Sequence, residues 1–363
     1  MKVAIAHDFI RHGGADKVLE DFHAMWPDSS VYTLHAEDLA QYKDWDIQSS
    51  WLQKYLPSDY YRWPFPLYPG LIERMPKRID WDVDLLLSSS VSYTKNLVAP
   101  EGVPHICYIY RPAMFAYDRQ NMFLSGYPKA LHPLLKGFCS SFKKWDQKHA
   151  QNPDVYVVLS KYIGEQVKRL YGVESRLVYP GVNIDQFMQA GIDTQPGDYY
   201  FCAIRLEGYK RVDLIIEACN LLKIKLKIAG NGPMRDALEK LAGPTVEFLG
   251  FVPDEEMAGL YANAKGFLFP SEEDFGIAPV EALAAGRPVI ALKKGGPQET
   301  VIHGETGVHF DEQRLEDIVE ALKIAEQTSW NADHIRDSSK QYSTAVFKQK
   351  MLEIAEEVVA TKQ

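Results

Sequence analysis

The residues with the clearest chemical potential lie in the segment 269–291, FPSEEDFGIAPVEALAAGRPVIA. An apolar run enters an acidic loop that ends at Gly276, and a helix with proline in its first turn is expected to follow. The free backbone amides at the start of that helix, near Ile277, form a site for an anion. Glu273 on the loop and Glu281 in the helix flank these amides, and carboxylates are good acceptors for paired sugar hydroxyls. The segment therefore predicts a site for a hexose at one end, a ribose at the other and a diphosphate between them.

Two basic residues upstream could neutralise the same diphosphate. Arg205 follows the apolar run YYFCAI, and Lys210 lies five residues later, so both are expected on the loop that leaves this strand. Guanidinium and ammonium groups bind phosphate oxygens through charge-assisted hydrogen bonds. The alternative interpretation is ordinary surface charge for the cations and a solvated acidic loop for the glutamates. Their combination with a strand end, a glycine and a helix start favours a ligand site.

The first half of the chain holds a weaker set of polar candidates. Gly13 and Gly14 follow the first apolar strand without the full GxGxxG spacing, so they suit a tight turn as well as a ligand loop. The segment 105–118, HICYIYRPAMFAYD, leaves another strand and enters a loop. Three of its side chains either face a cleft and contact an acceptor or serve the structure alone: Tyr110, Arg111 and Asp118.

Aromatic residues and prolines alternate within residues 54–78, which end with three basic side chains, Arg74, Lys77 and Arg78. Rings with nearby cations suit peripheral contact with a membrane or with a lipid-linked acceptor. The alternative is a loop whose rings cover the core of the first domain. We favour that alternative slightly, because the prolines preclude one continuous amphipathic helix.

Apolar runs and helical periodicities alternate along the chain, a pattern typical of an α/β fold with doubly wound parallel sheets. We expect an N-terminal domain over residues 1–192 and a second domain over residues 198–343. The turn-rich stretch 193–198, DTQPGD, is the expected linker. A final helix over about 344–363 is long enough to pack beside either domain. In such folds ligands bind at the carboxyl ends of the strands.

Composition limits the classes of partner. The 363 residues carry 40 Lys and Arg against 49 Asp and Glu, and this net charge of −9 disfavours nucleic acid as a partner. No apolar stretch is long enough to span a bilayer, and the N-terminus lacks the core of a signal peptide. We therefore expect a cytoplasmic protein. Its four widely spaced cysteines are expected as buried thiols: Cys107, Cys139, Cys202 and Cys219.

Three motifs of the second half together resemble glycosyltransferase family four: RLEGYKR at 205–211, AGNGP at 229–233 and EDFGIAPVE at 273–281. The run GGADKVLE after the first strand is similar to the N-terminal loop of that family, so the resemblance spans nearly the whole chain. It implies GT-B architecture, in which two Rossmann-like domains face a cleft and the last helix crosses back to the N-terminal domain. It also implies a nucleotide-sugar donor, retention of the anomeric configuration and no need for a metal ion.

The resemblance assigns roles by position. Glu273 would contact the hydroxyls of the donor sugar, and Glu281 would contact the nucleotide ribose. The implied catalytic residues are Glu273, Arg205 and Lys210, the last two as ligands of the diphosphate. The leaving phosphate oxygen would help to deprotonate the acceptor in a front-face displacement, while cations and helix amides stabilise the departing charge. The implied donor site comprises Gly13, Gly14, Arg205, Lys210, Val252, Glu273, Phe275, Gly276, Ile277 and Glu281.

The segment 269–291 further resembles bacterial mannosyltransferases of surface polysaccharide assembly, which use GDP-mannose. That branch reads C-Y-x-H-T-P-x-R-Y where this chain has CYIYRPAMF at 107–115, so Tyr110 and Arg111 replace a histidine and a threonine. The histidine lies beside the sugar and the acceptor, so its replacement bears on donor sugar and acceptor rather than on the diphosphate. We predict transfer of mannose from GDP-mannose to a glycan or polyprenyl-linked saccharide.

Several alternatives stay open at this point. The same fold could use a UDP-sugar, or act as an epimerase or a phosphorylase. Tyr110 and Arg111 make a non-catalytic nucleotide-sugar-binding protein conceivable, although the intact acidic and basic motifs of the second half argue against it. A membrane-associated scaffold acting through residues 54–78 is the last alternative.

Overall fold

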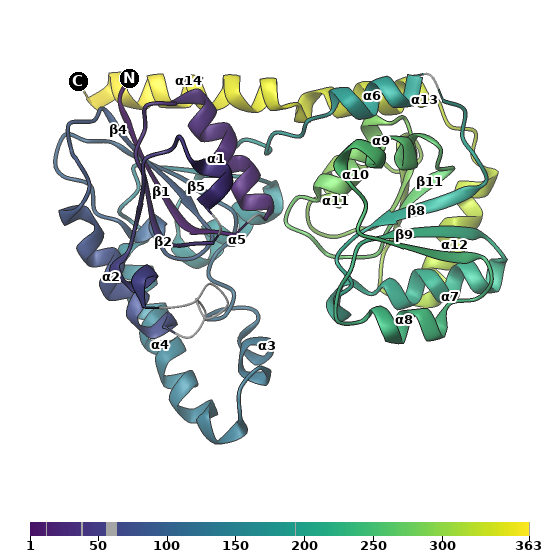
Figure 1. Cartoon of the computed structure of the whole chain (residues 1–363), viewed down its shortest axis with the longest axis horizontal. Coiled ribbons are helices and arrows are strands. Elements are labelled where there is room, and N and C mark those ends of the chain that lie inside the picture. Colours follow the sequence, from purple (N-terminus) through teal and green to yellow (C-terminus); the bar gives the residue numbers. More distant parts are fainter. Residues whose placement is uncertain (12, 38, 56–63, 193, 363) are drawn as a thin grey trace. The chain divides into compact units, whose positions relative to one another are not determined.

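The computed structural model describes residues 1–363 except 12, 38, 56–63, 193 and 363. The chain forms two compact units, shown in Figure 1. Unit 1 comprises Met1–Tyr179 and Phe347–Gln363, and unit 2 comprises Pro180–Val346. Each unit is built on one parallel sheet with helices packed against it, which confirms the predicted fold class.

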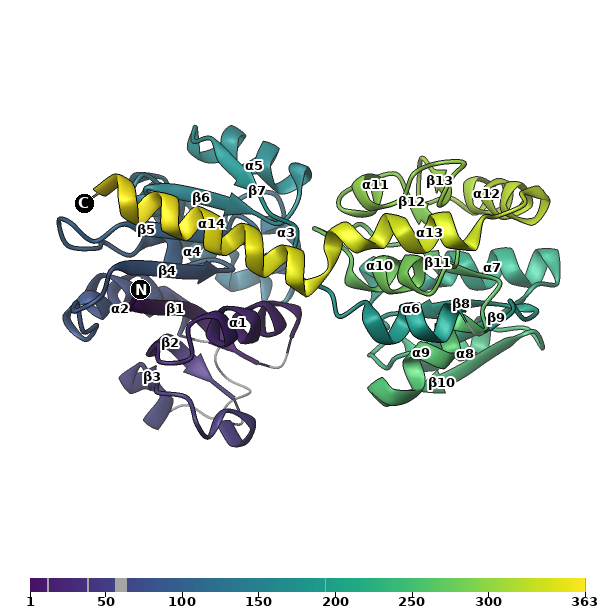
Figure 2. The ribbon, with the colours of Figure 1, turned by 90° about the horizontal axis from the view of Figure 1, so that it is seen from above.

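The sheet of unit 1 has seven strands in the order β3-β2-β1-β4-β5-β6-β7, as Figure 2 shows. All of its neighbouring strands are parallel. The direction of the strand order reverses at β1, and in such sheets ligands bind beyond the carboxyl ends of the strands at this switch point. The strands are β1 (Val3–Ile10), β2 (Val31–Ala36), β3 (Ile47–Ser49), β4 (Leu85–Ser90), β5 (His105–Ile109), β6 (Val155–Val158) and β7 (Ser175–Leu177).

The helices of unit 1 alternate with its strands along the chain. Helix α5 is capped by Ser160, whose side chain accepts a hydrogen bond from the amide of Ile163. The α-helices are α1 (Gly14–Met25), α2 (Tyr68–Arg74), α3 (Gln120–Ser125), α4 (His132–His149) and α5 (Lys161–Tyr171). The short 3-10 helices are η1 (Leu39–Tyr42), η2 (Trp51–Lys54), η4 (Phe65–Leu67), η5 (Met75–Lys77), η6 (Thr94–Asn96) and η7 (Lys129–Leu131).

A buried ion pair fixes α4 in unit 1. Lys95 Nζ lies 2.6 Å from Asp146 Oδ1, and both side chains are fully buried. Two hydroxyls, from Tyr117 and Tyr171, donate to the other oxygen of Asp146 at 2.8 and 2.9 Å. A buried charge pair is tolerated when its remaining hydrogen-bonding positions are filled in this way.

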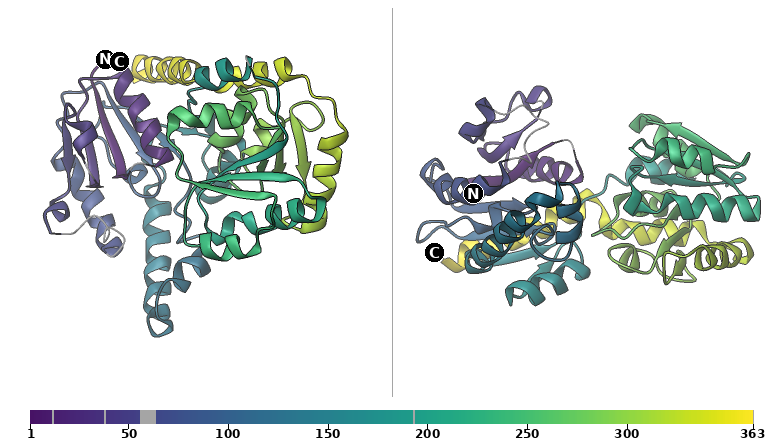
Figure 3. Two further views of the ribbon diagram at one scale, coloured as in Figure 1. Left: turned by 45° about the vertical axis from the view of Figure 1, so that its right-hand side comes forward. Right: turned by 90° about the horizontal axis from the view of Figure 1, so that it is seen from below.

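The rest of α4, with α3, extends past the sheet of unit 1 (Figures 1 and 3).

The last helix, α14 (Thr344–Lys362), belongs to unit 1 from Phe347 onward. The ring of Phe347 is buried, with its centroid 5.5 Å from that of Phe22 and 5.8 Å from that of Tyr108. Farther along, Arg176 makes two hydrogen bonds of 2.6 Å to the Glu357 carboxylate. The core of unit 1 is therefore completed by residues from the other end of the chain.

The sheet of unit 2 has six parallel strands in the order β10-β9-β8-β11-β12-β13, and its switch point lies between β8 and β11. The strands are β8 (Tyr199–Ala203), β9 (Lys225–Ala229), β10 (Val246–Gly250), β11 (Gly266–Phe269), β12 (Val289–Leu292) and β13 (Gly307–Phe310). The helices are α6 (Asp185–Ile192), η8 (Gly208–Lys210), α7 (Val212–Leu222), α8 (Arg235–Leu241), α9 (Asp254–Ala262), α10 (Ile277–Ala284), α11 (Pro297–Thr300), α12 (Leu315–Gln327), α13 (Ala332–Ser339) and η9 (Lys340–Tyr342).

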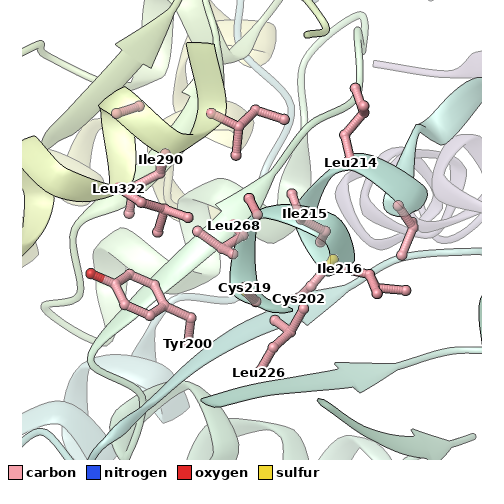
Figure 4. Packing of buried hydrophobic residues seen from close by; sticks show 14 of the residues in the cluster. Tyr200, Cys202, Leu214, Ile215, Ile216, Cys219, Leu226, Leu268, Ile290 and Leu322 are labelled. Carbon is pink, nitrogen blue, oxygen red and sulfur yellow. The ribbon is translucent and has the colours of Figure 1, made fainter. Parts of the chain in front are cut away.

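One face of this sheet packs against α7 and α12, as Figure 4 shows. Branched aliphatic side chains of both helices fill the space over the strands, where burial of apolar surface stabilises the unit. The cluster includes Tyr200, Cys202, Leu226, Leu268 and Ile290 from the strands, with Ile215, Ile216, Cys219 and Leu322 from the helices. All four cysteines of the chain are buried free thiols, as predicted.

The division between the units falls earlier in the chain than the expected linker, whose first residue, Asp193, lies outside the described residues. The reason is that α6 packs in unit 2. The ring of Phe187 lies edge-on to that of Tyr261, and Arg336 Nη1 donates to the carbonyl of Gly191 at 3.0 Å. An added Cβ at Gly191 would lie 2.3 Å from a neighbouring backbone oxygen, so this approach requires glycine.

Within the described residues, no helix combines the length and the apolar character needed to cross a bilayer. Of the aromatic segment 54–78, residues 56–63 lie outside the described part of the chain, so the prediction of a membrane contact there is not decided. The remainder forms η4, α2 and η5, and the rings of Phe65 and Tyr68 pack against the core of unit 1. These two rings fit the alternative of a loop that covers the core.

Candidate functional site

The predicted diphosphate and sugar ligands of the second half come from the two strands that flank the switch point of unit 2. Arg205 and Lys210 follow β8, and Glu273 follows β11. The carboxyl ends of parallel neighbouring strands lie at one edge of the sheet, so the two loops meet there. The arrangement that sequence spacing predicted for unit 2 thus has its physical basis in the β8–β11 pairing.

Lys210 and Glu273 are in direct contact at this edge, through Nζ and Oε1. Both side chains are largely buried, with 12% and 28% of their surface exposed. The fully buried Ser271 donates its hydroxyl to the same carboxylate oxygen at 3.1 Å. A diphosphate that approached Lys210 and a sugar hydroxyl that approached Glu273 would therefore be neighbours.

Arg205 is placed differently from Lys210. Its side chain is 76% exposed, and its Nε lies 3.1 Å from Oε1 of Glu207. A solvated pair of this kind contributes little to stability, so the guanidinium can change partner at small cost. Lys210 is the cation that the fold holds in position, and Arg205 is one that a ligand would have to recruit.

The helix start predicted beside these residues is present at α10. Gly276 precedes the helix with φ of +89°, a conformation that glycine adopts without strain. An added Cβ there would lie 3.3 Å from the ring of Pro279. The amides of Ile277 and Ala278 open the helix, where the backbone favours an anion.

Glu281 is oriented by a residue that the sequence analysis missed. The hydroxyl of Tyr261, on α9, donates to Glu281 Oε2 at 2.8 Å. Burial, and then the neighbouring carboxylate, hold the pKa of Tyr261 well above its usual value, so the hydroxyl stays a donor. Tyr261 reads as a core aromatic in the sequence, and only the packing of α9 against α10 reveals its second role.

Two adjacent glycines, also missed, hold the Glu273 loop. The amide of Gly296 donates to the carbonyl of Glu273 at 2.8 Å. An added Cβ would lie 2.1 Å from the Glu273 carbonyl oxygen at Gly295, and 2.0 Å from that of Phe275 at Gly296. The sequence signal was the pair of glycines in the segment KKGGPQE, which follows an apolar run.

The AGNGP loop supports the Arg205 loop in the same way. Gly230 has φ of +123°, and an added Cβ there would lie 2.0 Å from the carbonyl oxygen of Ile204. At Gly232 the corresponding distance to the carbonyl oxygen of Leu206 is 2.4 Å. The motif that carried the resemblance is thus a backbone support for the loop with the cations.

The two other predicted donor residues of unit 2 lie at different depths. The ring of Phe275 is buried, 5.7 Å from the ring of Tyr342, so its side chain serves the core. Val252 is half-buried in the loop after β10, next to Phe251, whose side chain is 80% exposed.

In unit 1, Gly13 and Gly14 form the turn into α1. Gly13 is the N-cap, and its amide donates to Asp16 Oδ2 at 2.7 Å. Burial raises the pKa of Asp16, but His7 and the amides of Gly13 and Arg11 outweigh it and hold that pKa below its usual value. The glycines therefore open a well-capped helix, which agrees with the tight-turn interpretation.

The three predicted acceptor residues separate in the structure. Tyr110 is buried, and its hydroxyl hydrogen-bonds Ser89 Oγ at 2.9 Å and the carbonyl of Ala15 at 3.0 Å. Asp118 is on the surface, paired with Arg169 at 2.9 Å. Arg111 alone lines a cavity, described below.

Among the described residues, no three His, Cys, Asp or Glu side chains gather as they would around a metal ion.

Comparison with known proteins finds a family model that matches residues within unit 2. The family model described as "Glycosyl transferases group 1" matches residues 185–342. An uncharacterized glycosyltransferase of Methanocaldococcus jannaschii is 28% identical over 203 residues, 53% of this chain and 56% of that protein. A GDP-mannose-dependent alpha-(1-6)-phosphatidylinositol monomannoside mannosyltransferase of Mycolicibacterium smegmatis is 29% identical over 47% of this chain and 52% of its own length. The chain thus spans about half the length of the curated relatives it matches.

Solved structures match the chain over both units. Anabaena HepE in complex with UDP-glucose has a TM-score of 0.70 at 16% identity, covering 98% of this chain and 100% of that one. Sucrose-phosphate synthase from Thermosynechococcus elongatus gives 0.71 at 16% identity, covering 99% and 100%. At this identity the likeness establishes the fold, which is the GT-B fold that the motifs implied.

Proposed function

The chain belongs to the glycosyltransferase group 1 family, and from this premise we propose that it transfers a hexose from a nucleotide-sugar donor to a glycan or lipid-linked saccharide. Transfer proceeds with retention and without a metal ion. The observation that carries the proposal is the contact between Lys210 and Glu273 at the switch point of unit 2, beside the start of α10.

The residues of this edge would divide the work as follows. Lys210 and the first amides of α10 stabilise the charge that develops on the departing diphosphate. Glu273, held by Ser271, accepts hydrogen bonds from the hexose. Glu281, oriented by Tyr261, accepts hydrogen bonds from the ribose.

We propose mannose on GDP as the donor. This rests on the resemblance of residues 269–291 to GDP-mannose-dependent enzymes and on the GDP-mannose dependence of the Mycolicibacterium smegmatis relative at 29% identity. A role in surface polysaccharide assembly stays a prediction.

Thermal unfolding with GDP, UDP, GDP-mannose and UDP-glucose tests the proposal. A ligand at about 100 times its Kd adds roughly 2.7 kcal/mol to the stability of the state that binds it, which is a clear shift in Tm. We expect GDP and GDP-mannose to raise Tm and the uridine nucleotides to do so less. A larger shift with UDP-glucose would replace the donor assignment, and no shift with any nucleotide would contradict the transferase proposal.

Lys210→Ala tests the residue that carries the proposal. A hydrogen bond to a charged group contributes roughly 1.5–3 kcal/mol, so donor affinity is expected to fall about 10- to 100-fold in calorimetry. Lys323→Ala removes an exposed lysine of α12 in the same unit and is the matched control. Equal donor affinity in both variants would remove Lys210 from the site.

A further inference from the structure

A cavity of about 610 Å³ lies in unit 1 at the carboxyl edge of its sheet. Its lining includes Phe9 at the end of β1, the stretch 91–93 after β4, and Arg111 and Phe115 after β5. β1 and β4 flank the switch point, where doubly wound sheets bind ligands. The volume is within the usual range for sites that enclose a small molecule or part of a larger one.

Half of the described residues that line this cavity are aromatic. The ring of Phe9 lies 5.2 Å from that of Tyr68, and the ring of Phe123 lies 5.4 Å from Phe65 and 5.6 Å from Phe115, measured between centroids. Except for Tyr68, these side chains are only half-buried, so they present carbon surface to the cavity. An apolar ligand would remove that surface from water, which is favourable without any directional contact.

The only charged side chains among the fourteen described lining residues are two arginines, Arg111 and Arg119. In a chain of net charge −9, this local excess of positive charge is notable. A guanidinium presents a planar set of donors that fits the oxygens of a phosphate.

An acidic side chain that contacts residues of this lining, Asp8, is bonded to the backbone. The Asp8 carboxylate accepts hydrogen bonds from the amides of Val91, Tyr93 and Thr94 at 3.0, 2.9 and 2.7 Å. It thereby fixes the loop after β4 that forms part of the lining. These amides stabilise the negative charge of the Asp8 carboxylate through charge-assisted hydrogen bonds.

The rim is formed by α3 and the turn after it. Met122 lines the cavity and is 51% exposed, so it marks the side open to solvent. Methionine is flexible and adapts to apolar groups of different shapes. A methionine at the rim therefore suits an elongated apolar ligand that the cavity encloses only in part.

We infer that this cavity binds the apolar chain of a lipid-linked acceptor, with the phosphate of that acceptor at Arg111 and Arg119. The inference rests on the proposed function, and it narrows the acceptor from glycans in general to saccharides carried on a lipid phosphate. A free glycan would need many directional polar partners. The described lining has no carboxylate and no side-chain amide, and the hydroxyls of one serine and three tyrosines lie among apolar side chains and two cations.

Calorimetry with farnesyl phosphate, below the concentration at which it aggregates, tests the inference on the full chain. Met122→Asp places a negative charge at the rim, and Arg119→Gln removes one cation. We expect each substitution to lower the affinity for farnesyl phosphate at least tenfold, while the affinity for GDP-mannose stays that of the wild type. Leu134→Asp, which changes a 73% exposed leucine of α4 outside the lining, is the matched control and should bind farnesyl phosphate normally.

Three outcomes would overturn the inference. Farnesyl phosphate does not bind the wild type, or it binds both rim variants as tightly as the wild type, or inorganic phosphate binds as tightly as farnesyl phosphate. In each case intact GDP-mannose binding would leave the proposed function standing. Loss of nucleotide binding in the wild type, in contrast, would contradict the proposed function itself.

Discussion

In unit 2 the loops beyond β8, β9, β11 and β12 meet backbone to backbone, whereas in unit 1 the space beyond β1, β4 and β5 is bounded by aromatic side chains. Close backbone packing leaves few alternative positions for Lys210 and Glu273. Rings and a methionine can adjust by rotating about their side-chain bonds. The same sheet architecture thus supports a rigid, charged edge in one unit and an adaptable, apolar edge in the other. A constant donor and a variable lipid chain would call for this difference.

Among the variants that test the rigidity of the unit 2 edge, Gly296→Ala is expected to have the largest effect. The new Cβ would lie 2.0 Å from the carbonyl oxygen of Phe275, so the loop that carries Glu273 must move. A hydrogen bond to a charged group contributes roughly 1.5–3 kcal/mol, so loss of the sugar contacts of Glu273 is expected to lower donor affinity on the order of 100-fold in calorimetry. Overpacking should also lower the free energy of unfolding by roughly 1–3 kcal/mol.

The control for that change is Gly259→Ala, on α9 of the same unit. An added Cβ there meets nothing within 4 Å, and alanine in a helix is more stable than glycine by roughly 0.5–1 kcal/mol. This variant should bind the donor normally. Similar donor affinities in the two alanine variants would mean that the edge of unit 2 is not rigid.

The next largest effect is expected at low pH, where buried His105 lowers the stability of unit 1. Burial lowers the pKa of His105 to about 3, and in the unfolded chain it returns to about 6.5. The unfolded state therefore binds the proton first, so this contribution to stability is complete above pH 6.5 and is lost as pH falls toward 3. The slope is at most about 1.4 kcal/mol per pH unit.

Chemical unfolding at several pH values, followed by tryptophan fluorescence, measures this slope. Six of the seven tryptophans fall within residues 1–179, so the signal reports mainly on unit 1. His105→Asn should flatten the decline between pH 6.5 and 4, whereas His334→Asn, which replaces an exposed histidine of unit 2, should not. An unchanged slope in His105→Asn would contradict the assignment.

The smallest expected effect is that of Tyr261→Phe. It removes the hydroxyl that orients Glu281, and a hydrogen bond of this kind contributes about 1 kcal/mol, or roughly fivefold in donor affinity. Tyr199→Phe removes a comparable hydrogen bond, 2.8 Å to the carbonyl of Leu260. Tyr199→Phe is the control and should leave donor affinity unchanged. An equal fall of donor affinity in the two variants would mean that the role of Tyr261 is structural only.

Most strands of the two sheets could be predicted from sequence because apolar runs and helical spacing are local signals, but β2, β3 and β13 were not predicted. The relation of Lys210 to Glu273 could also be anticipated, since each follows a strand and parallel strands end at one edge. The sequence could not show which candidate side chains are buried in contacts within the protein and which are exposed to a ligand. Tyr110 looked available for an acceptor, but it is buried against Ser89 and Ala15.

Residues that act through tertiary packing escaped sequence analysis for the same reason. Tyr261 and Gly296 matter only because α9 lies beside α10 and the loop after β12 lies against the loop after β11. The cavity of unit 1 draws on segments as far apart as Phe9 and Tyr127. No local pattern marks such an assembly, although the rings of residues 54–78 gave part of the signal.

Because α14 packs in unit 1, the two units can complete their folding only in a certain order during synthesis on the ribosome. Met1–Tyr179 emerges first, yet its core lacks Phe347 until all of unit 2 has been synthesised. Unit 2 is continuous in sequence and can close as soon as Val346 leaves the exit tunnel. The part made second is therefore the part that can finish first, and the nascent first unit must wait with the surface around Phe22 and Tyr108 uncovered.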